Sequence, residues 1–276
     1  MGNIILDPFS IKYCAGGILC FREFLQLTIF MEASKIMGFE FSVITDSLPA
    51  LLVGAKLTWI ITILGIVGGM VCGVLAGLGR IAGTEALGEE PHGIFKPISG
   101  VVRYISGGYV ETIRGTPIIV QAMFLYFAFP MLVKAIFDID RFRIEALTAA
   151  VITIIFNAGA YIAEIVRGSV ISVNKGLLEA GMSLGISRFQ LIAHIIGPIA
   201  FRRMIPPLGN QFIISLKDTS LFIVIGVGEL TRQGQEIMAS NFRALEIWLT
   251  VAIMYLIMTT VLAVSLRYIE KKMKIF

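Results

Sequence analysis

The sequence is poor in charged side chains. Asp, Glu, Lys and Arg make up 15% of the 276 residues, against about 25% in a typical soluble domain. Apolar residues make up 57%, which is too much apolar surface for a disordered chain. An ordinary soluble enzyme needs more charge on its surface than this sequence supplies. The composition therefore predicts a polytopic membrane protein.

Residues that commonly carry catalysis are also scarce. The chain has 2 histidines and 3 cysteines, which leaves few candidates for acid–base catalysis and no disulfide or zinc framework. The sequence contains neither the G-x-x-x-x-G-K-[ST] loop that cradles nucleotide phosphates nor an H-E-x-x-H zinc motif. We therefore expect that this chain is not an enzyme and binds no metal or cofactor of its own.

Long charge-free runs locate the membrane spans. A helix needs about 20 mostly apolar residues to cross a bilayer. Four runs of about this length carry no charge: residues 57–79, 115–133, 146–163 and 247–266. A fifth run, residues 204–228, is interrupted only by Lys217 and Asp218, whereas the stretch 189–201 contains Pro198 and is too short to cross alone. The sequence predicts an all-α fold with five spans.

The distribution of basic residues orients these spans. Of the lysines and arginines, 13 lie in the segments that follow the first, third and fifth spans, and 5 lie in the loops on the other side. Because basic loops stay in the cytoplasm, the sequence predicts a cytoplasmic carboxyl terminus and an amino terminus outside. The basic residues are not gathered on one soluble domain, so nucleic acid is not an expected partner.

Two regions differ from the pattern of apolar spans. Residues 1–36 hold two short apolar stretches separated by Arg22 and Glu23, and we interpret them as an amino-terminal extension ahead of a membrane domain at residues 37–276. Residues 83–108 are rich in glycine and contain several acidic side chains. This composition predicts an exposed cytoplasmic loop.

The cytoplasmic loop between the third and fourth spans, residues 164–203, has a distinct pattern. From Gly176 to Pro198 it reads GLLEAGMSLGISRFQLIAHIIGP. The apolar side chains at helical spacing are Leu177, Leu178, Met182 and Ile186. Gly181 and Gly185 are four residues apart and would share one side of a helix, where another backbone would approach closely. An amphipathic helix lying on its own bundle would show the same pattern.

This loop resembles the EAA loop of ABC importer permeases. In that loop Glu-Ala-Ala is followed by Gly and later by Ile-x-Leu-Pro. The positions that match are Glu179, Ala180, Gly185, Ile195 and Pro198. Gly181 replaces the second alanine and Gly197 replaces the leucine, and the spacing is intact.

Three further stretches resemble the polar amino-acid subfamily of these permeases. They read ETIRGTPIIVQAMFLYFAFP, NAGAYIAEIVRGSV and RRMIPPLGNQFIISLKDTSL. The stretch from Phe222 to Trp248 is most similar to permeases for glutamine. The resemblance runs from about Phe39 to the carboxyl terminus and leaves out residues 1–36 and about 83–100.

The resemblance implies a five-helix type I permease subunit of an ATP-driven ABC importer, located in the bacterial cytoplasmic (inner) membrane. Its expected cargo is a polar amino acid, with glutamine as the first choice. A second permease copy or a related permease would complete the translocation path. An ABC ATPase dimer, which carries the ATP and Mg, would bind on the cytoplasmic side, and a periplasmic or lipid-anchored amino-acid-binding protein would bind on the other.

The resemblance also assigns a role to the loop. Residues 176–187 would form a coupling helix, which sits in a groove of the ATPase. The residues that would contact or approach the ATPase are Glu179, Ala180, Gly181 and Gly185.

The fourth span carries two charged residues, Lys217 and Asp218. Charges at that depth are costly and mark functional sites. An adjacent cation and anion would answer the carboxylate and the ammonium of an amino acid. In the alternative interpretation they pair with each other, or with Arg202 and Glu164 near the membrane interface.

Three other polar residues are candidates for the substrate path because buried polar groups need partners. These residues are Asn157, Tyr161 and Asn210. Pro206 and Pro207 are expected to break the helix below this path.

An ion-coupled secondary amino acid carrier is the alternative function. Such a carrier would show paired repeats and intramembrane ion ligands. The sequence shows no convincing internal repeat.

Overall fold

The computed structural model describes residues 39–81, 95–139 and 142–273. All regular secondary structure in these residues is helical, which confirms the predicted all-α class. The expected amino-terminal extension, residues 1–36, lies outside the described residues.

Five helical stretches are long and apolar enough to cross a membrane, in agreement with the predicted number. They are Phe41–Ile81 (α2), Ile118–Phe137 (α4 and α5), Ala146–Ile171 (α6), Arg188–Ile225 (α8 and α9 with their connecting turns) and Ala244–Lys272 (α11). The helices extend beyond most of the charge-free runs because a charged side chain does not end a helix. At 1.5 Å per residue, the 41 residues of α2 measure about 60 Å, roughly twice the hydrocarbon thickness of a bilayer.

The second stretch consists of two short helices. Helix α4 (Ile118–Met123) begins after Pro117, which has an extended backbone at the amino-terminal cap. A π-helical turn, Phe124–Ala128, leads into α5 (Phe129–Phe137). This stretch is the least buried of the five spans.

Helices α2 and α6 pack closely along a row of glycines. Four glycines of α2 at four-residue spacing face α6: Gly65, Gly69, Gly73 and Gly77. A Cβ on Gly73 would lie 2.7 Å from the carbonyl oxygen of Gly159, and one on Gly77 would lie 2.8 Å from that of Ala163. Small residues allow this approach of two backbones, which is a common way of packing helices in membranes.

The prediction of an exposed loop at residues 83–108 is wrong for its second half. Residues Phe95–Arg114 form the helix α3, which packs against α2 and α6. The Tyr109 hydroxyl donates a hydrogen bond to the Phe156 carbonyl oxygen at 2.6 Å. Burial raises the pKa of Tyr109 to about 12, so the hydroxyl stays protonated and able to donate. Residues 83–94 lie outside the described part of the chain.

The region around the fourth span also differs from the prediction. Helix α8 (Arg188–Leu191) continues through a π-helical turn, Ile192–Ile196, into α9 (Gly197–Asp218). Pro206 and Pro207 lie inside α9 and do not end it. A membrane helix can continue past a proline when neighbouring helices support it. Helix α9 has such support because it packs against α6 and α11. The stretch 189–201 is therefore the first part of one long helical run that ends in a 3₁₀ turn at Thr219–Ile225.

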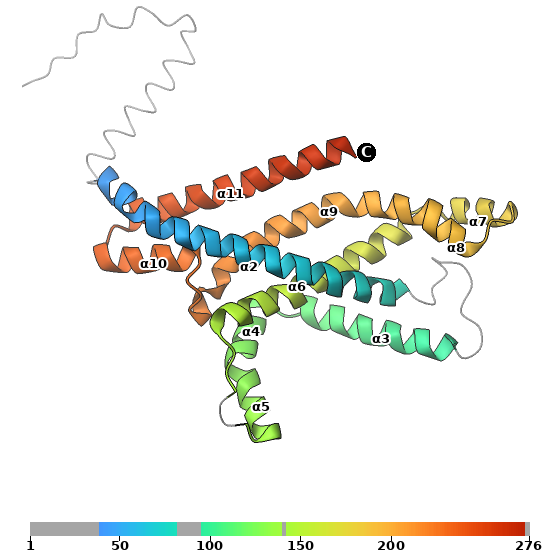
Figure 1. The fold of residues 1–276 in the computed structure, drawn as a ribbon, viewed down its shortest axis with the longest axis horizontal. Coiled ribbons are helices and arrows are strands. Elements are labelled where there is room, and N and C mark those ends of the chain that lie inside the picture. The colour runs from blue at the N-terminus through green and yellow to red at the C-terminus, as the bar shows by residue number, and fades with distance from the viewer. Residues whose placement is uncertain (1–38, 82–94, 140–141, 274–276) are drawn as a thin grey trace, which may run out of the picture.

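The two ends of the bundle carry different elements (Figure 1). Helices α2 and α6 finish at one end, where α7 (Lys175–Ser183) and α8 lie. Helix α10 (Leu230–Asn241) lies at the other end, beside the start of α11. We refer to these as the α7 end and the α10 end.

Helix α10 is fixed to the bundle by a buried acid. Glu229 is fully buried and accepts hydrogen bonds from the backbone N–H groups of Thr231 and Arg232 at 2.8 Å. The Tyr255 hydroxyl on α11 donates to the same carboxyl group at 2.9 Å. Burial raises the pKa of Glu229.

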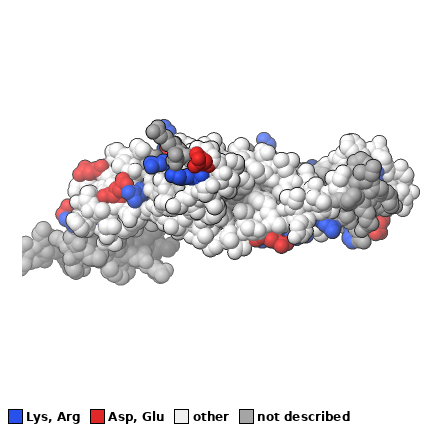
Figure 2. All heavy atoms as spheres, turned by 90° about the horizontal axis from the view of Figure 1, so that it is seen from below, with Lys and Arg blue, Asp and Glu red and all other residues white. Residues whose placement is uncertain are grey.

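The outer surface of the bundle is largely apolar. Large apolar side chains are exposed along α2, α4, α5 and α11. Uncharged residues cover most of the face seen in Figure 2. This surface is compatible with lipid or with a second membrane subunit.

Candidate functional site

The segment that connects α6 to α9 folds as two short capped helices. The Asn174 side chain accepts a hydrogen bond from the Gly176 N–H at 2.9 Å and caps α7. Ser187 and Gln190 form a reciprocal capping box at the start of α8. Arg203 on α9 donates to the hydroxyl oxygen of Ser172 at 2.9 Å and also to its carbonyl oxygen. The two caps order the α7–α8 segment, residues 175–191, and the Arg203 bonds join α9 to the end of α6, just before this segment.

The prediction that Gly181 and Gly185 share one side of a helix is wrong. Helix α7 ends at Ser183, and Gly185 lies in the following turn with a φ of +75°. Gly181 is buried inside α7, where an added Cβ would lie 2.1 Å from a methyl group of Leu191. Gly181 therefore allows α8 to pack on α7, whereas Gly185 allows the chain to turn.

The predicted apolar face is divided between two environments. Leu178 and Ile186 pack in a small core with Leu191. Leu177 and Met182 remain exposed, at 44% and 39%. One side of the segment thus packs on its own bundle, and another side exposes apolar side chains.

More exposed side chains enlarge this outer surface. Leu184 and Phe189 are each 79% exposed. Glu179 and Ala180 are exposed as well. We call the residues Leu177, Glu179, Ala180, Met182, Leu184 and Phe189 the α7–α8 surface.

Residues 181–185 also match the pattern G-x-S-x-G of a nucleophile elbow. In an elbow the serine stands on a sharp turn between a strand and a helix. Here Ser183 is the last residue of α7, and its hydroxyl donates to the Glu179 carbonyl oxygen at 2.9 Å. The structural context of a hydrolase is therefore missing at this serine.

A polar cavity of about 480 Å³ opens between α4, α6 and α9. Its lining residues are Arg114, Gly115, Thr116, Pro117, Ile118, Asn157, Tyr161, Gln211, Ile214 and Asp218. Its volume is within the range of small-molecule sites. Of the predicted path residues, the structure brings together Asn157, Tyr161 and Asp218.

The other two predicted path residues do not line this cavity. Lys217 and Asn210 are both exposed, and neither belongs to the lining. Consecutive residues of a helix point about 100° apart, and of this pair only Asp218 lines the cavity. Within the described part of the chain, Lys217 forms no ion pair with Asp218 or Glu164, and Asp218 forms none with Arg202.

The wall of the cavity is held by a chain of amide contacts. Asn157 donates to the Gln121 side-chain oxygen at 3.1 Å. The Gln121 side-chain nitrogen donates to the carbonyl oxygens of Ile113 and Thr116 at 2.7 and 3.0 Å. Gln121 therefore fixes the bend between α3 and α4 against α6.

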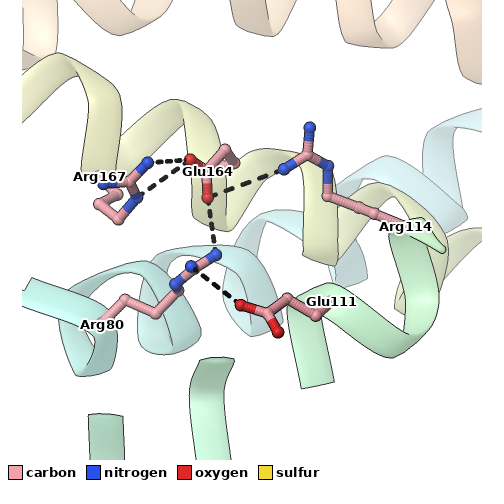
Figure 3. Close-up of polar contacts among 5 residues, drawn as sticks. All are labelled: Arg80, Glu111, Arg114, Glu164 and Arg167. Atoms are coloured by element: carbon pink, nitrogen blue, oxygen red, sulfur yellow. Dashed lines mark hydrogen bonds and ion pairs between the residues drawn. The ribbon is translucent and has the colours of Figure 1, made fainter. Parts of the chain in front are cut away.

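An ionic cluster lies beside the cavity and joins α2, α3 and α6 (Figure 3). Glu164 is its centre, because its carboxylate contacts Arg80 at 2.7 Å and the Arg167 Nε at 3.0 Å. Arg114 lies 3.9 Å from the same carboxylate, and Glu111 lies 3.8 Å from Arg80. We call these five residues the Arg–Glu cluster.

Arg114 belongs to both the cluster and the cavity. Its guanidinium lies over the Tyr161 ring, 5.3 Å from the ring centre. Neither Arg114 nor Gln211 is among the path residues predicted from the sequence. The sequence does contain a signal for Gln211. It precedes Asp218 by seven residues, or two helical turns, so the two residues share one face of α9.

Comparisons with known proteins agree with this architecture. The profile of the family described as binding-protein-dependent transport system inner membrane component matches residues 91–275. The chain is 54% identical over 239 residues to the glutamine transport system permease protein GlnP of Escherichia coli (strain K12), covering 87% of this chain and 100% of that protein. It is 35% identical over 226 residues to the L-cystine transport system permease protein TcyB of Bacillus subtilis (strain 168), covering 82% and 87%.

A solved structure has the same fold. The crystal structure of an amino acid ABC transporter with histidines includes a chain that matches with a TM-score of 0.71 and 29% identity, over 84% of this chain and 98% of that one.

Proposed function

Since this chain belongs to the family of binding-protein-dependent transport system inner membrane components, we propose that it is the permease subunit of an ATP-driven importer for glutamine. It is a multi-pass protein of the inner membrane and not an enzyme. The likeness to glutamine permeases supports the choice of glutamine. The neutral amide and hydroxyl groups in the polar cavity suit a neutral polar cargo.

The observation that carries this proposal is the α7–α8 surface. A transport subunit without a phosphate-binding loop needs a partner that hydrolyses ATP, together with a surface that receives the partner's motion. The α7–α8 surface exposes apolar side chains at one end of the bundle, and the other side of the segment packs in a small core that includes Val170 of α6 and Ala200 of α9. An ATPase dimer with bound ATP and Mg docks here and moves the membrane helices as rigid bodies.

The remaining partners follow from the same orientation. With the α7 end in the cytoplasm, the carboxyl terminus is inside and the amino terminus outside, and the α10 end faces the periplasmic or lipid-anchored binding protein. A second copy of this chain, or a related permease, contacts the exposed side of the bundle. The cargo passes the polar cavity, where Asn157, Tyr161 and Asp218 contact it.

Two substitutions, one on the α7–α8 surface and one in the turn between its helices, test the coupling. Glu179→Lys introduces repulsion against a basic site on the ATPase, and Gly185→Arg adds both bulk and strain to the turn. Both variants are expected to insert into the membrane at wild-type levels but to lose ATP-driven glutamine uptake in proteoliposomes.

The control for this experiment is Lys271→Glu, a charge reversal in the exposed last turn of α11. It should transport normally. Normal uptake by Glu179→Lys or by Gly185→Arg would contradict the proposed coupling.

A further inference from the structure

The polar cavity contains two charged side chains of opposite sign. Arg114 comes from the end of α3, and Asp218 comes from the end of α9. All other residues of the lining are uncharged. A zwitterion therefore finds one group of each sign in this cavity.

Arg114 retains most of its hydrogen-bonding capacity. Arg80 and Arg167 already contact the two oxygens of Glu164 at hydrogen-bonding distance. Arg114 stays 3.9 Å from that carboxylate, which is beyond a hydrogen bond. Over the ranges that the structure describes, the Arg114 guanidinium donates no hydrogen bond. The Arg–Glu cluster holds three guanidinium groups and two carboxylates, so Arg114 is its surplus cation.

Asp218, at the end of α9, is in a comparable position. Its side chain is half-buried in the last turn of α9. Among the described residues, none donates a hydrogen bond to its carboxylate or forms an ion pair with it. A carboxylate that loses water without gaining a partner is costly, and such residues within spans mark functional sites.

These two groups match the invariant part of every α-amino acid. A guanidinium binds a carboxylate through two parallel N–H···O bonds, and an aspartate accepts hydrogen bonds from an ammonium. The amide side chains of Asn157 and Gln211 then lie in the same cavity for a polar side chain.

We propose that the polar cavity binds the amino-acid head group, with Arg114 on its carboxylate and Asp218 on its ammonium. This inference rests on the proposed function, since it identifies the groups that recognise the cargo. The cargo carboxylate replaces Glu164 as the partner of Arg114, while Arg80 and Arg167 keep Glu164 neutralised. Binding of cargo thereby shifts the end of α3 relative to α6.

The test measures binding to the permease–ATPase complex without the binding protein, because that protein selects amino acids itself. The probes are glutamine, glutaminol, in which a hydroxymethyl group replaces the α-carboxylate, and glutaramic acid, which lacks the α-ammonium. The wild-type complex should prefer glutamine to each analogue by about 10- to 100-fold, the range for a charge-assisted hydrogen bond.

Each variant should lose one preference and keep the other. Arg114→Gln is expected to bind glutamine and glutaminol equally but still to reject glutaramic acid, and Asp218→Asn is expected to do the reverse. Arg114→Lys should retain part of the preference, since the charge remains without the planar fork. Arg103→Gln, an exposed arginine on α3 outside the cavity, should behave like the wild type.

The outcomes separate this inference from the proposed function. If the wild-type system imports glutamine but Arg114→Gln still rejects glutaminol fully, the head-group site is wrong and the importer stands. The same holds if the importing complex binds none of the three probes. If the wild-type system imports no glutamine with ATP and the binding protein present, the proposed function fails and the assignment fails with it.

Discussion

At the scale of single residues, Gly185 has a role that other residues cannot take over without cost. Its φ of +75° lies in the left-handed region, which costs a residue with a Cβ about 1–2 kcal/mol. An added Cβ at this position would meet no neighbouring atom. The cost of substitution is therefore conformational rather than steric.

Gly185→Ala should consequently loosen the turn between α7 and α8. A loss of about 1 kcal/mol corresponds to roughly fivefold faster amide exchange if the turn opens locally. Hydrogen exchange measured by mass spectrometry over residues 184–191 checks this expectation. Gly185→Asn is the matched control, because asparagine tolerates the left-handed region better, and it should exchange more slowly than the alanine variant. Equal exchange in wild type and Gly185→Ala would contradict the explanation.

Part of the cavity is predictable from the sequence, but its cation is not. Asn157, Tyr161 and Asp218 were identified because polar residues inside apolar spans need partners. Lys217 is predicted on the same ground as Asp218, a charge inside a span, but neighbours on a helix face different directions. Arg114 was missed because only the fold brings the end of α3 beside α6.

At the scale of elements, the contact between α2 and α6 depends on the glycine row. An added Cβ at Gly73 would lie 2.6 Å from the Ile162 Cβ as well as 2.7 Å from the Gly159 carbonyl oxygen. The backbone atom cannot rotate away, so the two helices must separate.

Gly73→Ala should therefore lower the stability of the purified permease by about 1–3 kcal/mol. The free energy of unfolding in detergent measures the effect. The matched control is Gly168→Ala on α6, where an added Cβ meets nothing within 4 Å. That variant should match or exceed wild type, since alanine favours a helix by up to about 1 kcal/mol. Equal stability of the Gly73 and Gly168 variants would argue against close packing of α2 on α6.

The spans were more predictable than the connections between them. Charge-free runs reveal helices that cross a membrane because the solvent itself demands apolar surface. Helix α3 contains Gly100, Gly107 and Gly108, which weaken helix propensity. It was predicted as a loop because its packing on α2 and α6 comes from the tertiary fold. The helix break predicted at Pro206 and Pro207 is absent for the same reason, since packing in the tertiary fold supports α9.

At the scale of the whole molecule, two sites are joined by the helices they share. The α7–α8 surface follows α6, and the polar cavity is lined by α6 and α9. Glu164 and Arg167 of the Arg–Glu cluster lie on α6, seven residues or fewer from its end at Ile171. Under the proposed function, motion of an ATPase docked at the α7–α8 surface would therefore act directly on the walls of the cavity.

The central claim is that ATP hydrolysis by a partner drives import through this chain. The decisive measurement is glutamine uptake by proteoliposomes that contain the permease, its ATPase and the binding protein, with ATP supplied on the side of the α7–α8 surface. Uptake should require ATP and should persist when ionophores collapse all ion gradients. Uptake that proceeds without ATP and stops when the gradients collapse would contradict the account and identify an ion-coupled secondary carrier instead.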